Sequence, residues 1–161
     1  MISPRPALCL ILQSNSRKKN RKVKSRRDQF HVKMKNTKEC LLIDDDPDDR
    51  EIFCMALQEI DKSIKCVLAN NGSDALTILK PLTFTPDFIF IDINMPGMNG
   101  IQCLTEIKKL DHLKDAKIIM YSTSAQPKIV ELTKNLGAND FLVKPVTLDL
   151  LTEQLSTIFL N

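Results

Sequence analysis

The sequence predicts an α/β protein built on a five-stranded parallel sheet that is doubly wound, with helices on both faces. From Glu39 onward, short apolar runs alternate with longer segments of helical period, a pattern typical of βα units. Such units form parallel sheets that are covered on both faces. The 161 residues, 43% of them hydrophobic, supply apolar material for one compact domain with a substantial core.

The strands are expected where the apolar runs lie. In chain order they are Cys40–Ile43, Lys65–Ala69, Phe88–Ile91, Lys117–Tyr121 and Asp140–Val143. Helices are expected between and after them, at Pro47–Ile60, Ser73–Lys80, Gly100–Leu110, Pro127–Leu136 and Leu148–Phe159. The first and last helices each gather an apolar stripe, which comprises Ile52, Phe53, Ala56, Leu57 and Ile60 in one and Leu148, Leu151, Leu155, Ile158 and Phe159 in the other.

Local signals mark several of the helix ends. A proline suits the first helical turn, where its missing N–H costs nothing, and Pro47 and Pro127 stand at such positions. Asp46 and Thr147 are expected to act as N-caps. Gly137 is expected to end the fourth helix in a left-handed conformation.

Charge is divided sharply along the chain. Residues 1–38 hold 12 Lys or Arg against one acidic residue, whereas residues 39–161 hold 11 against 19. We therefore predict a basic, disordered leader at 1–38 and an acidic domain at 39–161. Such a leader could contact nucleic acid or an anionic membrane. We favour the hypothesis that it has no specific role and that the native chain starts at Met34.

The cysteine pattern argues against a zinc site. None of the five cysteines forms a CxxC pair or stands near a histidine at the spacing of zinc ligands. We interpret them as reduced thiols of a cytoplasmic protein, where free cysteine behaves as a small buried hydrophobe. Both histidines, His31 and His112, are expected at the surface.

Residues suited to phosphoryl chemistry end four of the apolar runs. Asp44 and Asp45 follow the first run, Asp92 the third, Ser122 the fourth and Lys144 the fifth. Ligands of such sheets bind at the carboxyl ends of the strands, so these side chains are expected to meet at one edge. That edge is predicted to hold a divalent cation and a phosphoryl group.

The predicted pocket needs positive charge because like charges a few ångströms apart destabilise the fold. Oxygen ligands without histidine or cysteine suit Mg²⁺ or Mn²⁺ better than zinc. Asp92 is the expected nucleophile. The turn that follows it, INMPGMNG, is rich in Gly and Pro and is expected to leave its side chain accessible. The cation, Lys144 and the Ser122 hydroxyl would each cover one phosphoryl oxygen.

Four segments, LLIDDDP, FIDINMPGMNG, IIMYSTS and FLVKPV, stand in this order over the acidic domain. Together they resemble the receiver domain of bacterial two-component response regulators, which has a flavodoxin-like fold. The resemblance implies that Asp44 and Asp45 form the acidic pair of the metal site and that Asp92 is the phosphoacceptor. It also implies that the backbone carbonyl of Asn94 is a metal ligand.

The same resemblance implies further roles near the fifth strand. Lys144 is expected to contact the phosphoryl group, and the Lys144–Pro145 bond is expected to be cis. Ser122 and Phe141 are expected to be the switch residues. Two points stay open: Thr123 is a second hydroxyl candidate, and the triple aspartate at 44–46 leaves the register of the acidic pair ambiguous by one.

A receiver of this kind is a phosphoacceptor switch rather than an enzyme. Mg²⁺-dependent phosphorylation of Asp92 would change the surface formed by the fourth helix, fifth strand and fifth helix. We expect no output domain, so the signal would pass to an unidentified protein partner. The expected phosphodonor is a sensor histidine kinase or a His-containing phosphotransfer protein. We expect a monomer or a phosphorylation-dependent dimer, with no contact to nucleic acid through this domain and none to membrane.

Two other functions remain as alternatives. A haloacid-dehalogenase-like phosphatase would use Asp44 and Asp46 as its nucleophile motif, but it needs a later acidic motif. Only Asp149 and Glu153 follow Lys144, inside an amphipathic helix, so this alternative is weak. A scaffold that binds partners without phosphorylation would keep the same fold.

Overall fold

The computed structural model describes residues 37–160. Nearly all of the predicted leader, including the hypothetical start at Met34, lies outside the described residues. Cys9 and His31 lie outside them too. The predictions for that part of the chain therefore stay predictions.

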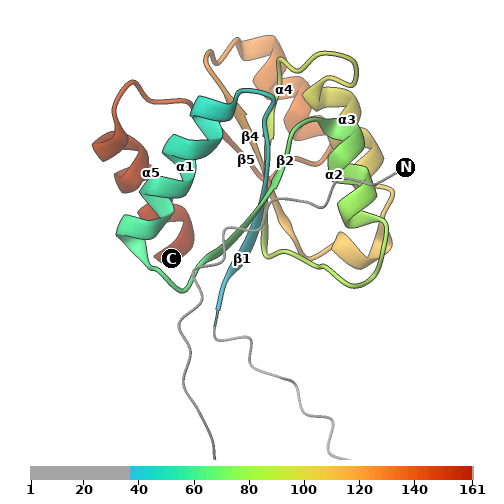
Figure 1. Ribbon diagram of the computed structural model, residues 1–161. Helices are drawn as coiled ribbons and strands as arrows, with labels where there is room; N and C mark the ends of the chain where they lie inside the picture. Colours follow the sequence, from blue (N-terminus) through green and yellow to red (C-terminus); the bar gives the residue numbers. More distant parts are fainter. Residues whose placement is uncertain (1–36, 161) are drawn as a thin grey trace, which may run out of the picture.

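A five-stranded parallel sheet forms the centre of the domain (Figure 1). Its strands are β1 (Glu39–Ile43), β2 (Lys65–Ala69), β3 (Phe88–Asp92), β4 (Lys117–Ser122) and β5 (Asp140–Val143). They stand in the order β2-β1-β3-β4-β5, and every neighbouring pair is parallel. The predicted fold class is confirmed.

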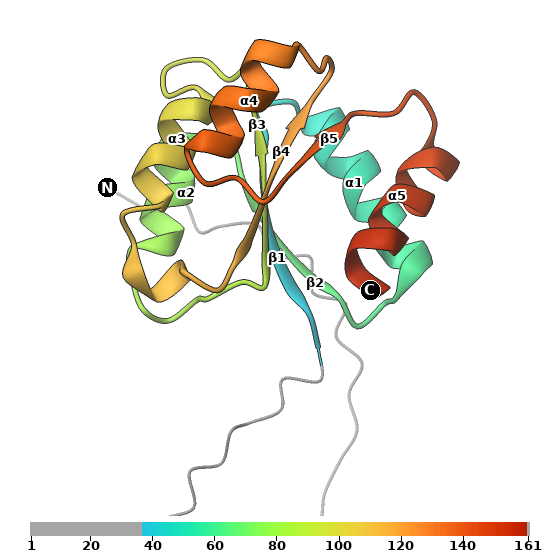
Figure 2. The same cartoon turned by 180° about the vertical axis from the view of Figure 1, so that it is seen from behind.

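Helices cover both faces of the sheet. They are α1 (Pro47–Ile60), α2 (Gly72–Leu79), α3 (Gly100–Ile107), α4 (Pro127–Asn135) and α5 (Leu148–Leu160). Figures 1 and 2 show α1 and α5 side by side on one face and the other three on the opposite face. The third helix is shorter than predicted, because a separate 3₁₀ turn at Asp111–Leu113 follows it.

Alternate residues of each strand enter two separate cores. In β1, Leu41 and Ile43 pack with α2 and α3, whereas Leu42 packs with α1 and α5. On the α1 side, the ring of Phe53 lies 4.9 Å from that of Phe90 in an edge-to-face contact. Ile52 is exposed, so its predicted place on the buried stripe of α1 is wrong.

The helix-end signals predicted at Asp46, Thr147 and Gly137 are confirmed. The side chain of Asp46 accepts a hydrogen bond from the Asp48 amide at 2.9 Å and caps α1. The Thr147 hydroxyl accepts from the Leu150 amide at 3.4 Å at the start of α5. Gly137 follows α4 with a φ of 98°.

Two minor expectations have different outcomes. The four described cysteines, Cys40, Cys54, Cys66 and Cys103, are all free, as predicted. His112 is half-buried rather than a simple surface residue, because its Nε2 lies 2.8 Å from the Leu79 carbonyl oxygen.

Candidate functional site

The carboxyl edge of the sheet brings the predicted residues to one place. Asp44 directly follows β1, and Asp92 is the last residue of β3, where it pairs with Tyr121. Ser122 ends β4 and pairs with Val143, the residue before Lys144. The strand ends therefore converge as the sequence pattern indicates.

Lys144 lies at the centre of this edge and contacts three carboxylates. Its Nζ is 2.7 Å from Asp44 Oδ2, 2.8 Å from Asp49 Oδ2 and 3.0 Å from Asp92 Oδ1. An ammonium group has three N–H donors, so one donor is available for each carboxylate. The side chain is only 10% exposed, and its Nζ also lies 5.1 Å from the centre of the Tyr121 ring.

Burial and ion pairing act against each other in this cluster. Burial alone would favour the neutral amine, but the hydrogen bonds to Asp44, Asp49 and Asp92 outweigh it and raise the pKa of Lys144 above its ordinary value. Burial also raises the pKa of Asp44, although the hydrogen bond from Lys144 opposes this rise. The ammonium is therefore the charge that permits carboxylates to lie buried together.

Asp92 is less accessible than the sequence indicates. The residue is 5% exposed, so the expectation that its Gly- and Pro-rich turn leaves it open is wrong. Both carboxylate oxygens have partners: Oδ1 contacts Lys144, and Oδ2 accepts the Asn94 amide hydrogen bond at 2.7 Å. Asp92 is thus buried partly by the charged side chain of Lys144 rather than by apolar core residues alone.

Asp49 is a site residue that the sequence prediction missed. It lies in the first turn of α1, where an acidic residue also interacts favourably with the positive end of the helix dipole. This turn is tied to the end of β1, because Arg50 donates to the Asp44 carbonyl oxygen at 2.7 Å. The Asp46 amide also donates to Asp44 Oδ1 at 3.0 Å.

The carboxylates are gathered about the ammonium rather than in a ready metal cage. Between residues 37 and 160, no three acidic, cysteine or histidine side chains are arranged to hold a metal ion. The donor chemistry nevertheless fits a hard divalent cation, since buried Asp44 and Asp92 offer only oxygen atoms. Asp45 is exposed beside them.

The remaining predicted site residues have defined surroundings. Ser122 is buried at the end of β4, whereas Thr123 is exposed. Phe141 is half-buried and packs with the core on the α2 and α3 side. The Lys144–Pro145 bond is trans, since the described residues contain no cis peptide bond, and the expected cis bond is wrong. Trans is the more stable isomer of most X–Pro bonds.

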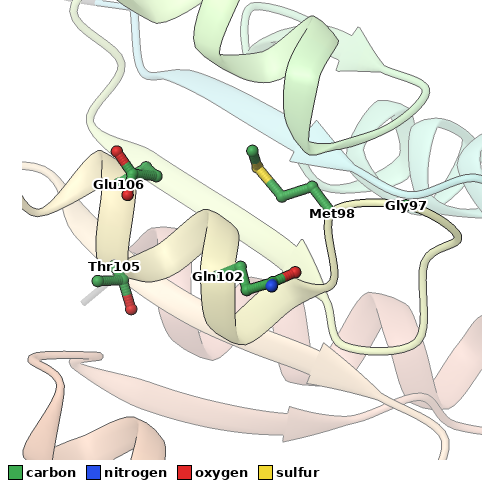
Figure 3. A pocket seen from close by; sticks show the side chains of 5 residues that line it. All are labelled: Gly97, Met98, Gln102, Thr105 and Glu106. Carbon is green, nitrogen blue, oxygen red and sulfur yellow. The ribbon is translucent and has the colours of Figure 1, made fainter.

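A pocket lies beside α3 (Figure 3). Its lining residues come from the loop after β3 and from α3; they are Gly97, Met98, Gln102, Thr105 and Glu106. None of them contributes to the carboxylate and ammonium cluster, so the chemistry of the site lies at the sheet edge.

Comparison with known proteins identifies the family. Residues 40–156 match the response regulator receiver domain. The chain belongs to the response regulator receiver domain family, whose members are phosphoacceptor switches in two-component signalling rather than conventional enzymes. Domains of this family bind a divalent cation and work with histidine kinases. This match excludes the phosphatase alternative.

Several relatives have names related to chemotaxis. The chemotaxis protein CheY of Thermotoga maritima is 40% identical over 90 residues, which cover 56% of this chain and 72% of that protein. The CheY of Pseudomonas aeruginosa is 31% identical, with 74% of this chain and 94% of that protein covered. A probable cyclic di-GMP phosphodiesterase of Vibrio cholerae is also 31% identical, but this chain spans only 29% of it.

Solved structures agree with the fold. Chemotaxis protein CheY4 of Vibrio cholerae superposes with a TM-score of 0.66 at 28% identity, covering 76% of this chain and 99% of that one. The Mn²⁺-bound form of response regulator Rcp1 gives a TM-score of 0.67 at 25% identity, covering 75% and 91%. Within the part of the chain that the structure describes, no helix has the length and apolar character needed to cross a membrane.

Proposed function

We propose that this chain is a signalling switch in which Asp92 accepts a phosphoryl group from a sensor histidine kinase or a His-containing phosphotransfer protein. The observation that supports this most is the placement of Asp92 and Asp44 within 3.0 Å of one ammonium, at the edge where parallel sheets bind ligands. The signal would pass to a protein partner that the sequence does not identify.

The transfer needs little covalent help from the protein. An Asp92 carboxylate oxygen forms a bond to phosphorus while the bond from phosphorus to the donor nitrogen breaks, and the departing imidazole keeps that electron pair and takes up a proton from water. Lys144 keeps its own proton and donates an N–H to a phosphoryl oxygen. Catalysis rests on position and charge, because the transferred group is nearly dissociated at the transition state.

The cation site is proposed at the same edge. Asp44, Asp45, Asp92 and the backbone carbonyl of Asn94 would hold Mg²⁺, with Mn²⁺ as a substitute. The bound cation would neutralise charge on the phosphoryl oxygens. The oxygen-only donors of the pocket support this choice, and so does the Mn²⁺-bound form of the related Rcp1.

The output would run through the α4, β5 and α5 surface. Phosphorylation adds about −1.5 to −2 charge at Asp92. We propose that buried Ser122 moves toward the new group and that Phe141 turns inward behind it. The surface above them exposes apolar side chains that a protein partner could cover, namely Leu132, Val143, Val146 and Leu150.

The wider setting is proposed on the same basis. The 39–161 segment would act as one receiver unit in the cytoplasm, without direct contact to nucleic acid or membrane. It would be a monomer or a dimer that forms on phosphorylation. The chain spans 29% and 18% of two longer relatives, so activities of those whole proteins are not carried over.

Incubation with acetyl phosphate and Mg²⁺ is expected to give one labile phosphoryl adduct on the protein, measured by intact mass. In Asp92→Asn the adduct is expected to disappear, because the amide lacks the nucleophilic oxygen. The exposed Asp115→Asn is the matched control and should react like the wild type. No adduct in the wild type would support the scaffold alternative instead. Steady phosphate release from varied monoesters would contradict the proposed switch.

Asp45→Ala is expected to weaken Mg²⁺ binding about tenfold or more, since a ligand carboxylate is lost. Asp46→Ala should leave Mg²⁺ affinity unchanged and lower the free energy of unfolding by about 1 kcal/mol, because the cap on Asp48 is removed. Calorimetric titration with Mg²⁺ and thermal unfolding measure the two effects. If instead Asp46→Ala weakens Mg²⁺ binding and Asp45→Ala does not, the acidic pair is mis-registered by one residue.

A further inference from the structure

Asp49 is the third partner of the Lys144 ammonium, and the proposed transfer chemistry does not use it. Its Oδ2 lies 2.8 Å from Nζ, a contact nearly as short as the 2.7 Å contact from Asp44. The three carboxylates come from different elements: Asp44 follows β1, Asp49 belongs to α1, and Asp92 ends β3. Lys144 is thus held from three directions.

We infer that Asp49 is a positioning residue that keeps the Lys144 ammonium over the pocket while Asp44 and Asp92 take part in phosphoryl transfer. The inference rests on the proposed function, because it concerns the same site. It adds a role for α1 that was not predicted from the sequence.

The three carboxylates differ in what the transfer asks of them. Asp92 must form a bond to phosphorus through one carboxylate oxygen, and Asp44 is a proposed ligand of the cation, so both carboxylates have a second role during the transfer. Both are almost fully buried, whereas the Asp49 side chain is 35% exposed at the rim. Asp49 is the one partner to which the proposed transfer assigns no other role.

A lysine needs such a partner more than a rigid side chain would. Its ammonium is a compact charge on a flexible four-carbon chain with three rotatable donors, so a single bond fixes its position poorly. Small errors of position at a reacting centre reduce rates strongly. An anchor that persists through the reaction would keep one N–H directed at the phosphoryl oxygen.

The local structure makes Asp49 a firm anchor. It stands in the first turn of α1, which Asp46 caps and which Arg50 ties to the Asp44 carbonyl oxygen. The positive end of the helix dipole favours the charged carboxylate at this position. Asp48, one residue earlier in the same turn, is exposed and is not among the Lys144 contacts.

The experiment compares Asp49→Ala, Asp49→Asn and the control Asp48→Ala, after thermal unfolding has confirmed that each folds. The first readout needs neither cation nor phosphodonor: acylation of Lys144 by an N-hydroxysuccinimide ester, measured by peptide mass relative to the exposed Lys65. Asp49→Ala should label Lys144 about threefold faster or more, because one of three bonds is lost. Asp49→Asn should lie between it and the wild type, since an amide oxygen still accepts an N–H. Asp48→Ala should match the wild type.

The second readout is the phosphorylation rate with acetyl phosphate at saturating Mg²⁺. Asp49→Ala is expected to react about tenfold more slowly, with Asp49→Asn closer to the wild type. Equal or faster phosphorylation of Asp49→Ala would overturn the inference and identify Asp49 as a competitor for the lysine. An equal loss in Asp48→Ala would also overturn it, because bulk charge would then be the cause.

The two proposals fail in different ways. If the wild type gives no adduct at all, the proposed function fails, and the role of Asp49 in transfer fails with it. If the wild type is phosphorylated and Lys144 labels equally in every variant, the positioning role alone is overturned.

Discussion

Gly100→Ala is expected to lower the free energy of unfolding by about 3 kcal/mol or more, because a side chain at this position has no room. A Cβ atom on Gly100 would lie 2.2 Å from the Asp92 carbonyl oxygen and 2.8 Å from the Ile93 Cα, both of which are backbone atoms. Gly100 begins α3, and its amide donates to the Ile93 carbonyl oxygen, so the helix cannot move away freely. Thermal unfolding should show a midpoint lower by about 10 °C or more.

Gly97→Ala is the matched control in the same loop. Gly97 has a φ of 75°, but a Cβ there would meet no atom within 4 Å. The expected loss is about 1 kcal/mol, the cost of a left-handed conformation for alanine. If the two variants have the same unfolding midpoint, the close approach of α3 to the backbone of Asp92 does not cause the loss of stability in Gly100→Ala.

Lys144→Ala is expected to cost about 3–5 kcal/mol of stability at neutral pH, because it leaves buried carboxylates without their counter-charge. Asp44 is 1% exposed and Asp92 5%. Lys109→Ala is the control: its Nζ is 2.6 Å from Glu106, but the lysine is 62% exposed. That surface pair should contribute less than about 0.5 kcal/mol. Chemical denaturation of both variants measures the contrast.

The loss of stability in Lys144→Ala should depend on pH. Burial already raises the pKa of Asp44, and removing the ammonium that opposes this raises it further. A group whose pKa is higher in the folded state binds its proton more tightly there, so folding gains stability as the pH falls through that pKa. The difference in free energy of unfolding between variant and wild type should therefore become smaller as the pH falls from neutral toward 3.8, the ordinary pKa of Asp. A gap that stays constant with pH would contradict this account.

Mg²⁺ should restore part of the stability of Lys144→Ala if the proposed cation site is right. A second source of positive charge would then neutralise the same carboxylates, and a ligand that binds only the folded state stabilises it. Thermal unfolding with and without Mg²⁺ measures this. No stabilisation of the variant would contradict a cation site at this edge.

The fold was predictable because local and long-range signals agree. β2, β5 and α1 have the predicted bounds, since apolar runs, proline and caps define them locally. The strands β3 and β4 each extend one residue further, to Asp92 and Ser122. Pairing with the neighbouring strand sets those ends, and polar residues at strand ends give no local sign of it.

Most residues that meet at the sheet edge were predictable from the sequence, but Asp49 and the arrangement about Lys144 were not predicted. Strand ends converge by topology, which places Asp44, Asp92 and Lys144 correctly. Side-chain packing, which the sequence pattern does not give, determines which carboxylates contact the ammonium. A signal for Asp49 existed: it lies four residues before buried Phe53, on the same face of α1. A cationic partner stabilises an acidic residue that is partly buried on the same face as a buried stripe.

Tyr121 gives the site a built-in optical reporter. The chain has one tyrosine and no tryptophan, so its intrinsic emission comes from a single ring beside the strand ends. The Lys144 ammonium lies 5.1 Å from that ring, and Phe53 of α1 lies against it at 5.6 Å. Any event that draws the ammonium away changes the electric field on the fluorophore, so occupancy of the pocket can be followed in the unlabelled protein.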